Sequence, residues 1–586
     1  MQGYDLLIRN GTIIDGTGGG RYEADIAIRD GRIAVIGRKI PGTATHTLDA
    51  TGKIVAPGVI DPHTHYDAQI NWDPYCTNSG WHGNTTFIVG NCGFGFMPCR
   101  AADRERYMRM MENTEQIPVG AMKKALPWTW ETFPEWMSHM KSIPKGVNIG
   151  AFMPINSLMI YVMGYEAAKS RRATTAEKTE MKRLFIEALD HGAVGFGLSH
   201  LNEFNSHKDC DGSPMPSDSM HVEDIYPLAE VLRERGRGAI QFLAELPVFV
   251  SNREHVEALA RISGRPVLHN VITPFDFLPE YHRGILKWLE ECQGRGLQIY
   301  SQALCMRAWN ESIVSDYNAW QGFEPFFEFT NAGDQSAKAK LAADPDFRER
   351  ARKSYDPIAM GTGGGSVESF ILLTAPGAPE WEPYCGQTFS QIAAERDAAA
   401  IDCFLDVIAA TGARMEFRTT EATSRDPQKI WEVLSHPYTL CGTSDGGAHI
   451  KFFSGGQFAT DNIMQMVRET GRMTLEQIHH KLSALPAKVF GFEGRGTLEL
   501  GSWADLYIYD FDKLGYDASK FEIVHDLPDG DWRRVVRAQG ISWIVVNGEI
   551  TFVDGEATGA VPGRVITNGG PVSERALAPQ VLVAAK

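Results

Sequence analysis

Two histidines separated by one residue follow an apolar run near the beginning of the chain. Residues 58–65 read Gly-Val-Ile-Asp-Pro-His-Thr-His, so His63 and His65 come directly after a strand-like segment. Alternate side chains of a strand share one face, and both imidazoles could therefore reach one metal ion at the carboxyl end of the strand. The pair could also be two ordinary polar loop residues, but its position directly after a strand favours a metal site.

Two further side chains that can bind metal follow strand-like runs in the same way. Cys92 stands in Gly-Asn-Cys-Gly after the run 85–89, and Asp445 stands in Ser-Asp-Gly-Gly after the run 438–441. Taken alone, such a cysteine is most often a buried apolar residue, and Ser-Asp-Gly-Gly is a good turn. A thiolate is, however, a strong zinc ligand, and a carboxylate beside a metal can act both as a ligand and as a base.

The spacing of the apolar segments predicts the scaffold that must hold these residues. Eight strand-like runs alternate with helical patterns, for example at 175–191 and 253–262. This alternation predicts an α/β fold in which parallel strands close into a (β/α)8 TIM barrel, whose active sites lie at the carboxyl ends of the strands. The predicted barrel strands are 54–60, 85–89, 147–152, 193–199, 239–243, 266–268, 297–304 and 438–441.

Both ends of the chain have the pattern of antiparallel β structure. Asn-Gly and Asp-Gly hairpin signals occur within the first 31 residues, and strand-like segments return near the carboxyl end. We therefore predict one small β-sandwich domain composed of residues 1–56 and 490–586. The TIM-barrel catalytic domain, residues 57–489, would be inserted between these two parts, since the termini of a domain often lie close together.

The connection between the seventh and eighth predicted strands is too long for a single βα unit. It predicts a large insertion at about residues 305–388, followed by a helix near 389–411. The insertion carries four phenylalanines that could wall an apolar pocket, although forming the core of the insertion itself is the default for such residues. They are Phe323, Phe326, Phe327 and Phe329.

The order of these and further motifs resembles the D-aminoacylase (N-acyl-D-amino-acid deacylase) family of the amidohydrolase superfamily. The resemblance covers most of the chain, and many segments in the right order are more specific than any one of them. The segments are His-Thr-His-Tyr-Asp at 63–67, Ser-Gly-Trp-His-Gly-Asn-Thr-Thr at 79–86, Gly-Asn-Cys-Gly at 90–93, Trp-Thr-Trp-Glu-Thr-Phe-Pro-Glu-Trp at 128–136, Gly-Phe-Gly at 195–197, Ser-Asp-Gly at 444–446, Leu-Pro-Ala at 485–487, Gly-Arg-Gly at 494–496, Ala-Asp-Leu at 504–506, Thr-Gly at 558–559 and Pro-Gly-Arg at 562–564.

The resemblance implies a metal-dependent amidohydrolase with zinc at the mouth of the barrel. Four side chains would bind the metal: His63, His65, Cys92 and Asp445. Asp445 would also orient the nucleophilic water, take its proton and pass it to the leaving amine. His449, four residues further on, could contact substrate or metal, or could simply cap a loop.

The family pattern breaks at the ends of the fifth and sixth strands, where the family carries histidines. This sequence has Gln241 at the fifth strand, and His269 at the sixth is predicted to be retained as a metal ligand. His200, His207 or Glu245 could replace the missing histidine, although each is more simply a polar loop residue. The departures favour one firmly bound zinc ion over two, and they put the substrate in question.

The resemblance implies hydrolysis of an N-acyl-D-amino acid to a carboxylate and a free D-amino acid. The carboxylate of such a substrate would need a cationic partner, and Arg307, just past the seventh strand, is the candidate. The aromatic insertion and Gln241 point to other substrates on the same fold, namely a cyclic amide or a hydrophobic aryl or fatty-acyl amide. The absent fifth-strand histidine also leaves open a catalytically inactive barrel that serves as a binding subunit.

Composition narrows the range of partners. The chain has 586 residues and a net charge of −16, which argues against nucleic acid and anionic membranes. No apolar run is long enough for a signal peptide or a membrane span. Nine cysteines without a CxxC pair fit a reduced cytoplasmic protein, in which Cys76 and Cys99 are expected to be structural. A small-molecule amide is the expected partner, and a homo-oligomer is left open.

Overall fold

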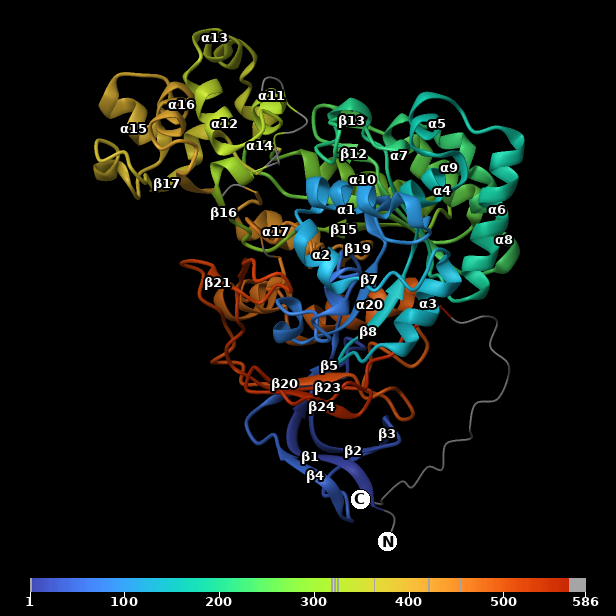
Figure 1. Cartoon of the computed structure of the whole chain (residues 1–586). Helices are drawn as coiled ribbons and strands as arrows, with labels where there is room; N and C mark the ends of the chain where they lie inside the picture. The colour runs from blue at the N-terminus through green and yellow to red at the C-terminus, as the bar shows by residue number, and fades with distance from the viewer. Residues whose placement is uncertain are drawn as a thin grey trace.

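The computed structural model describes residues 3–317, 320, 323, 326–362, 364–419, 422–453 and 455–568. It combines a β-sheet region, in which blue and red segments meet, with a mixed α/β region and a helical region at the upper left of Figure 1. The last predicted residues of the β domain, 569–586, lie outside the described part of the chain.

Both ends of the chain contribute to one continuous β-sheet of nine strands. Val55 near the amino end lies opposite Ile508 near the carboxyl end, and both are fully buried in the aliphatic core of the sheet. The predicted β domain from both ends is therefore a single hydrogen-bonded sheet. Its strands, in spatial order, are β25 (Glu556–Ala557), β24 (Glu549–Val553), β23 (Ile541–Val546), β20 (Leu506–Tyr509), β5 (Ile54–Pro57), β1 (Tyr4–Ile13), β2 (Tyr22–Arg29) and β3 (Arg32–Gly37), with β4 (Ala44–Asp49) paired to β1.

Parallel strands follow one another in chain order through the middle of the chain. The strands form two hydrogen-bonded sets. Along the chain, only Phe152 separates the last strand of the first set from the first strand of the second. At the other end of the series, a parallel bridge joins Thr64 and Gly446, which follow the first and the last strand. The first set is β6 (Val59–Asp61), β7 (Asn84–Val89) and β8 (Asn148–Ala151); the second is β9 (Met153–Pro154), β10 (Gly195–Ser199), β11 (Ala239–Leu243), β14 (Val267–Ile272), β15 (Ile299–Ala303) and β19 (Thr439–Cys441).

The first predicted strand, 54–60, is divided at Gly58 between the two regions. β5 pairs within the terminal sheet, whereas β6 pairs with β7. A Cβ atom at Gly58 would lie 2.2 Å from the Thr85 hydroxyl oxygen, so no side chain fits at the junction. The break passes the chain directly from the terminal sheet into the strand that carries the two histidines.

Helices follow most of these strands, as the sequence predicts. Thr174 and Thr132 each begin a helix with a reciprocal capping box, so the predicted helix start in the Trp-rich segment 128–136 is present. No helix among the described residues combines the length and apolar character needed to cross a membrane. The helices between strands include α1 (Arg104–Glu115), α2 (Val119–Ala125), α3 (Phe133–Ser142), α4 (Ile155–Met163), α5 (Tyr165–Ser170), α6 (Thr175–Asp190), α7 (Pro216–Ser219), α8 (Tyr226–Arg235), α9 (Arg253–Ser263), α10 (Tyr281–Gly294), α17 (Pro427–Ser435), α18 (Phe458–Asn462), α19 (Leu475–His479) and α20 (Leu485–Phe490).

The insertion extends further along the chain than the sequence predicts. The helical segment near 389–411 packs on α12 and α13 of the insertion instead of returning to the parallel strands, because its apolar side chains complete the core of the insertion. A small antiparallel sheet then closes the insertion at Thr419. Its elements are β16 (Asn310–Ile313), α11 (Phe326–Thr330), α12 (Gln335–Ala343), α13 (Pro345–Ser354), α14 (Pro357–Gly361), β17 (Ile371–Thr374), α15 (Phe389–Arg396), α16 (Ala400–Ala410) and β18 (Glu416–Thr419).

The four phenylalanines singled out in the insertion divide between core and cavity. Phe326 and Phe329 are buried in the hydrophobic core, where Phe326 contacts the ring of Trp320. Phe323 belongs to this core as well, and together with Phe327 it lines a cavity of about 600 Å³ between the insertion and the loop after β10. Both alternatives for the aromatic segment are therefore represented.

Replacing Phe404 on α16 by alanine is expected to destabilise the insertion. Its fully buried ring contacts Trp320, Phe370 and Phe417, and truncating such a ring costs about 3–5 kcal/mol. Hydrogen exchange should become faster in α12 and α16 while the parallel strands keep their protection. Phe327→Ala, at a partly exposed cavity wall, serves as the control. Equal effects of the two substitutions would contradict the assigned core.

Candidate metal centre

Three strand ends bring the predicted metal-binding side chains together. His63 and His65 follow β6, Cys92 lies in the turn after β7, and Asp445 follows β19. Cys92 and Asp445 both have left-handed backbone conformations, with φ of 54° and 48°. Such conformations cost free energy in residues other than glycine, and they persist where the surrounding structure fixes a side chain in place.

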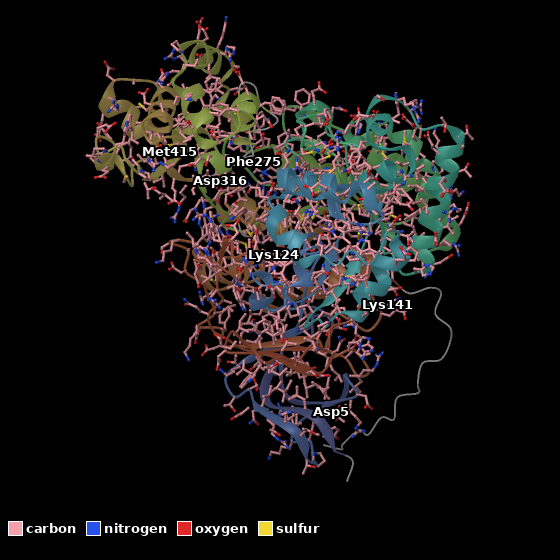
Figure 2. All side chains as sticks on the ribbon, in the orientation of Figure 1. Asp5, Lys124, Lys141, Phe275, Asp316 and Met415 are labelled. Carbon is pink, nitrogen blue, oxygen red and sulfur yellow. The ribbon has the colours of Figure 1, made fainter. Side chains whose placement is uncertain are left out.

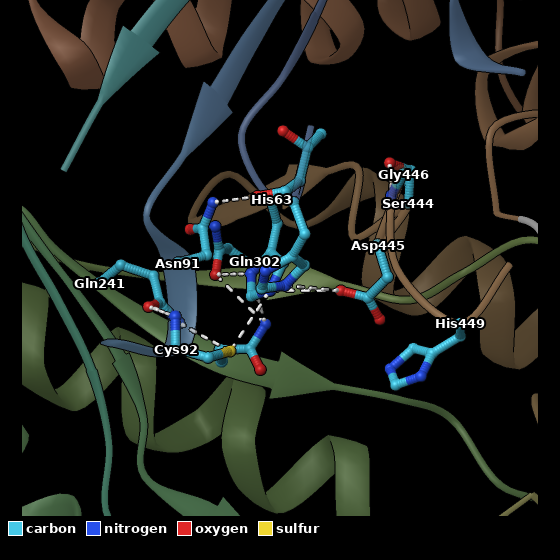
Figure 3. Close-up of polar contacts among 12 residues, drawn as sticks. His63, Asn91, Cys92, Gln241, Gln302, Ser444, Asp445, Gly446 and His449 are labelled. Carbon is cyan, nitrogen blue, oxygen red and sulfur yellow. Dashed lines mark hydrogen bonds and ion pairs between the residues drawn. The ribbon is translucent and has the colours of Figure 1, made fainter. Parts of the chain in front are cut away.

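The donor atoms of these four residues lie close to one another, and Figure 3 shows three of the residues, His63, Cys92 and Asp445. His63 Nε2 lies 3.5 Å from Cys92 Sγ and 3.3 Å from Asp445 Oδ1, and His65 Nε2 lies 3.9 Å from the same carboxylate oxygen. His63, His65 and Cys92 are buried, whereas the Asp445 side chain is 25% exposed. Three donors are thus shielded from water, and the carboxylate faces the open side.

The chemical state of the donors fits a soft divalent cation. Burial lowers the pKa of His63 and lowers that of His65 well below its ordinary value, so both imidazoles are neutral and carry a free lone pair. Burial raises the pKa of the Cys92 thiol, which therefore ionises readily only beside a cation. Two nitrogens, one sulfur and one carboxylate oxygen form a donor set that zinc prefers.

Three side-chain amides, those of Gln241, Gln302 and Asn270, form hydrogen bonds that position these donors. Gln241 on β11 accepts a hydrogen bond from the Cys92 backbone N–H at 2.6 Å, which fixes the turn that carries the thiol. Gln302 Oε1 on β15 lies 3.0 Å from His63 Nδ1, and Asn270 on β14 lies 3.1 Å from the same atom. A hydrogen bond at Nδ1 orients the ring and leaves Nε2 free for a metal.

The structure places His269 away from the centre, which corrects its prediction as a metal ligand. Side chains alternate along β14, so Asn270 points toward His63 whereas His269 points outward. His269 Nδ1 lies 2.9 Å from the Ser301 hydroxyl, and its ring packs against Trp288 of α10. At the fifth and sixth strands, amides of Gln241 and Asn270 thus occupy the inward positions.

Two other predicted residues, His200 and Glu245, have partners elsewhere. His200 Nδ1 lies 2.6 Å from the Ser217 carbonyl oxygen. Glu245 forms two hydrogen bonds with the Arg253 guanidinium and lies 3.4 Å from His269 Nε2. Although burial acts to raise it, these contacts hold the pKa of Glu245 at about 2. Glu245 is therefore ionised, and its negative charge is paired with the Arg253 guanidinium.

Arg307 does not face the cavity beside Asp445, in contrast to its predicted role as a partner for a substrate carboxylate. Its guanidinium forms ion pairs with Asp461 at 2.6 Å and with Glu469 at 2.7 Å. The two carboxylates neutralise the guanidinium within the protein, because they come from the helical segment after β19. Arg307 therefore joins two segments of the scaffold.

Comparison with known proteins decides the family. The family model described as "Amidohydrolase family" matches residues 46–213 and 387–552, more than half of the chain. The chain belongs to the amidohydrolase family. It is a hydrolase that acts on carbon–nitrogen bonds other than peptide bonds. The unmatched middle of this amidohydrolase contains β11, β14, β15 and most of the insertion.

Relatives align with this amidohydrolase along nearly its whole length. An N-acyl-D-aspartate deacylase of Alcaligenes xylosoxydans xylosoxydans is 26% identical over 577 residues, covering 97% of this chain and 96% of the relative. An uncharacterized protein of Mycobacterium tuberculosis is 27% identical over 582 residues, covering 95% and 93%. Among solved structures, an N-acyl-D-glutamate deacylase from Bordetella bronchiseptica, complexed with zinc and a phosphonate inhibitor, is 24% identical with a TM-score of 0.64, covering 96% of this chain and 100% of that chain.

A cavity of about 260 Å³ opens beside Asp445 in this amidohydrolase. Among the described residues that line it, none is a lysine or an arginine. Phe275, labelled in Figure 2 near the junction of the insertion and the region of parallel strands, belongs to its apolar wall. The apolar wall consists of Leu201, Leu243, Leu246, Pro247, Val271, Phe275, Leu304, Ala422, Phe452 and Phe453.

A second group of possible ligands lies at the edge of the same cavity. It joins two predicted residues, His207 and His449, with Glu115, which the sequence analysis missed. Burial lowers the pKa of His207 to about 4 and that of His449 to about 3. Glu115 ends α1 within the long connection between β7 and β8, and no spacing in the sequence relates it to either histidine. Only its position in the last turn of an amphipathic helix would have marked it as buried.

Proposed function

We propose that this protein is a zinc-dependent hydrolase that cleaves the amide bond of a neutral N-acyl compound. In this proposal the parallel strands form one closed (β/α)8 barrel, and the zinc ligands lie at its carboxyl mouth. The convergence of the four donors from three strand ends carries the proposal, together with the neutral state of the imidazoles. The four proposed ligands are His63, His65, Cys92 and Asp445.

The residues around the centre divide the catalytic work between them. When bound, zinc would supply Lewis-acid polarisation of the scissile carbonyl and would make water a stronger nucleophile near neutral pH. Asp445 Oδ1, the only partly exposed donor, would accept the proton of the attacking water and deliver it to the leaving nitrogen. Gln302 and Asn270 would hold the His63 ring in place, and Gln241 would hold the Cys92 turn.

The walls of the cavity favour a substrate without a carboxylate. A buried carboxylate needs a cationic or hydrogen-bonding partner, because burying an unpaired ion costs several kcal/mol. The described lining offers no lysine or arginine, its neutral polar residues, such as Asn205 and Asn310, are outnumbered by apolar ones, and Arg307 is already paired. With a volume of about 260 Å³, the cavity suits a small aryl or alkyl group. We therefore favour hydrophobic acyl or aryl amides over N-acyl-D-amino acids, the compounds for which the two deacylases compared above are named.

A matched pair of substrates tests this preference. N-Benzoyl-D-alanine and N-benzoylethylamine share an acyl group and an amine carbon skeleton, but only the first carries a carboxylate. We expect kcat/KM to favour the carboxylate-free compound at least about tenfold, equivalent to about 1.4 kcal/mol. N-Benzoyl-L-alanine controls for stereochemistry. Preference for the D-amino acid derivative would refute the proposed substrate class, and hydrolysis of no acyl amide would refute the proposed reaction.

A further inference from the structure

Glu115 ends helix α1 with a carboxylate that has no hydrogen-bond partner. Its side chain is 0% exposed, and neither oxygen accepts a hydrogen bond within the described part of the chain. The carboxyl of Asp67 is also buried and lacks a partner among the described residues. Such a concentration of buried acidic groups is unfavourable unless a proton or a cation compensates it.

Three imidazoles lie near the Glu115 carboxylate, those of His65, His207 and His449. His449 Nε2 lies 3.8 Å from Glu115 Oε2, and His65 Nδ1 lies 3.7 Å from Oε1. One ligand atom each from Glu115, His207 and His449 lie within 4.8 Å of one another. The ring centroids of His207 and His449 lie 5.8 Å apart, and the ring planes are inclined by 27°.

The distances do not correspond to hydrogen bonds. Donor–acceptor separations of 3.7 and 3.8 Å exceed the usual limit of about 3.2 Å for an N–H···O hydrogen bond. The 3.8 Å between His449 Nε2 and Glu115 Oε2 suits two ligands that share a cation at about 2.0–2.2 Å from each of them. A single proton on Glu115 could serve only one neighbour, and the Nδ1 atoms of His65, His207 and His449 would still lack partners among the described residues.

We propose that Glu115, His207 and His449 form a second divalent transition-metal site, separate from the centre at His63 and Cys92. Two imidazole nitrogens and a carboxylate oxygen are the donor types that suit Zn²⁺ or Co²⁺. The site lacks a sulfur ligand, which distinguishes it chemically from the first centre. It uses neither of the amides at the fifth- and sixth-strand ends, Gln241 and Asn270.

The site connects three loops around the cavity. Glu115 comes from the connection after β7, His207 from the loop after β10 and His449 from the loop after β19. The His449 backbone N–H already donates to the Glu115 carbonyl oxygen at 2.6 Å, and Figure 3 places His449 beyond Asp445 as seen from His63. His207 and His449 both line the cavity beside Asp445. A cation there would fix the position of this wall relative to the catalytic carboxylate.

Cobalt titration of the metal-free full-length protein distinguishes the two sites. A thiolate ligand gives Co²⁺ a near-ultraviolet charge-transfer band, whereas a site with only nitrogen and oxygen ligands gives visible bands alone. We expect two equivalents of Co²⁺ per chain, one of them with the thiolate band. Metal content after gel filtration, measured by mass spectrometry, should independently give two ions per chain.

Glu115→Gln and His449→Asn should each reduce the content to one ion while leaving the thiolate band unchanged. Cys92→Ser should remove the thiolate band and keep the visible bands of the second ion. His255→Asn, a partly buried histidine that contacts Tyr226 on α8, is the matched control and should keep both ions. His207→Asn, at a less buried position, replaces either test variant if that variant does not fold.

A single ion in the wild-type protein that carries the thiolate band would overturn the second site, as would two ions in all three second-site variants. Loss of the thiolate band in Glu115→Gln would also overturn it, because Glu115 would then act through His65 on the first centre. Absence of the thiolate band from the wild-type protein would instead count against the proposed catalytic centre. The two proposals therefore fail in different ways.

Discussion

Asp445→Asn is expected to lower kcat by about two to four orders of magnitude, the usual contribution of a positioned general base. The amide keeps the shape of the carboxylate but cannot accept the proton of the attacking water. Because three other donors remain, the protein should still bind metal at the first centre. Steady-state kinetics on the preferred acyl amide, together with metal analysis of the same preparation, checks both expectations.

Asp190→Asn on α6 provides the matched control for this loss. Its carboxylate forms a surface ion pair with Arg235, and its side chain is 42% exposed, so activity should stay near the wild-type value. Thermal unfolding of both variants separates a catalytic effect from a loss of structure. If Asp445→Asn kept kcat within tenfold of the wild type, Asp445 could not be the general base.

Cys92→Ala is expected to release the ion of the first centre and to abolish measurable hydrolysis. The thiolate is the only sulfur donor of the group, and His63 Nε2 lies 3.5 Å from it. Dialysis against a chelator should remove metal from the variant under conditions in which the wild-type protein retains it. Readdition of excess Zn²⁺ should restore little activity. The Gln241 hydrogen bond would still hold the turn in place, but the turn would no longer carry a thiolate to bind the ion.

Cys99→Ala is a suitable control because Cys99 is equally buried and lies only seven residues further along the chain. Its thiol contacts only the Arg100 carbonyl oxygen at 3.6 Å among its described partners. The substitution should leave metal content and kcat unchanged. Equal retention of zinc by both alanine variants would show that Cys92 is not a ligand.

The parts of the site that follow strands could be predicted from the sequence, because strand ends have a recognisable pattern. His63, Cys92 and Asp445 each follow a short apolar run, and the structure brings their side chains together. His269 could not be distinguished from Asn270, because a shift of one residue in a strand exchanges its two faces. Only the contact between Asn270 and His63 settles which residue points inward.

The rest of the site depends on connections whose course is not local. Glu115 reaches His449 across more than 300 residues of sequence, and no periodic pattern links a helix end to a distant loop. The end of the insertion could not be predicted from the sequence either. The pattern of α16 predicts a helix both in the insertion and among the parallel strands, and only its packing on α12 shows that it belongs to the insertion. Arg307 looked available because the two carboxylates that neutralise it lie more than 150 residues away.

The pairing of β5 with β20 has a consequence for synthesis of the chain. Roughly 450 residues separate these strands, which corresponds to about 20–90 s of translation at 5–20 residues per second. During that time the growing chain presents an unpaired edge next to the segment that leads into His63 and His65. Exposed edges of this kind recruit other strands, so nascent chains would depend on chaperones until the last hundred residues emerge.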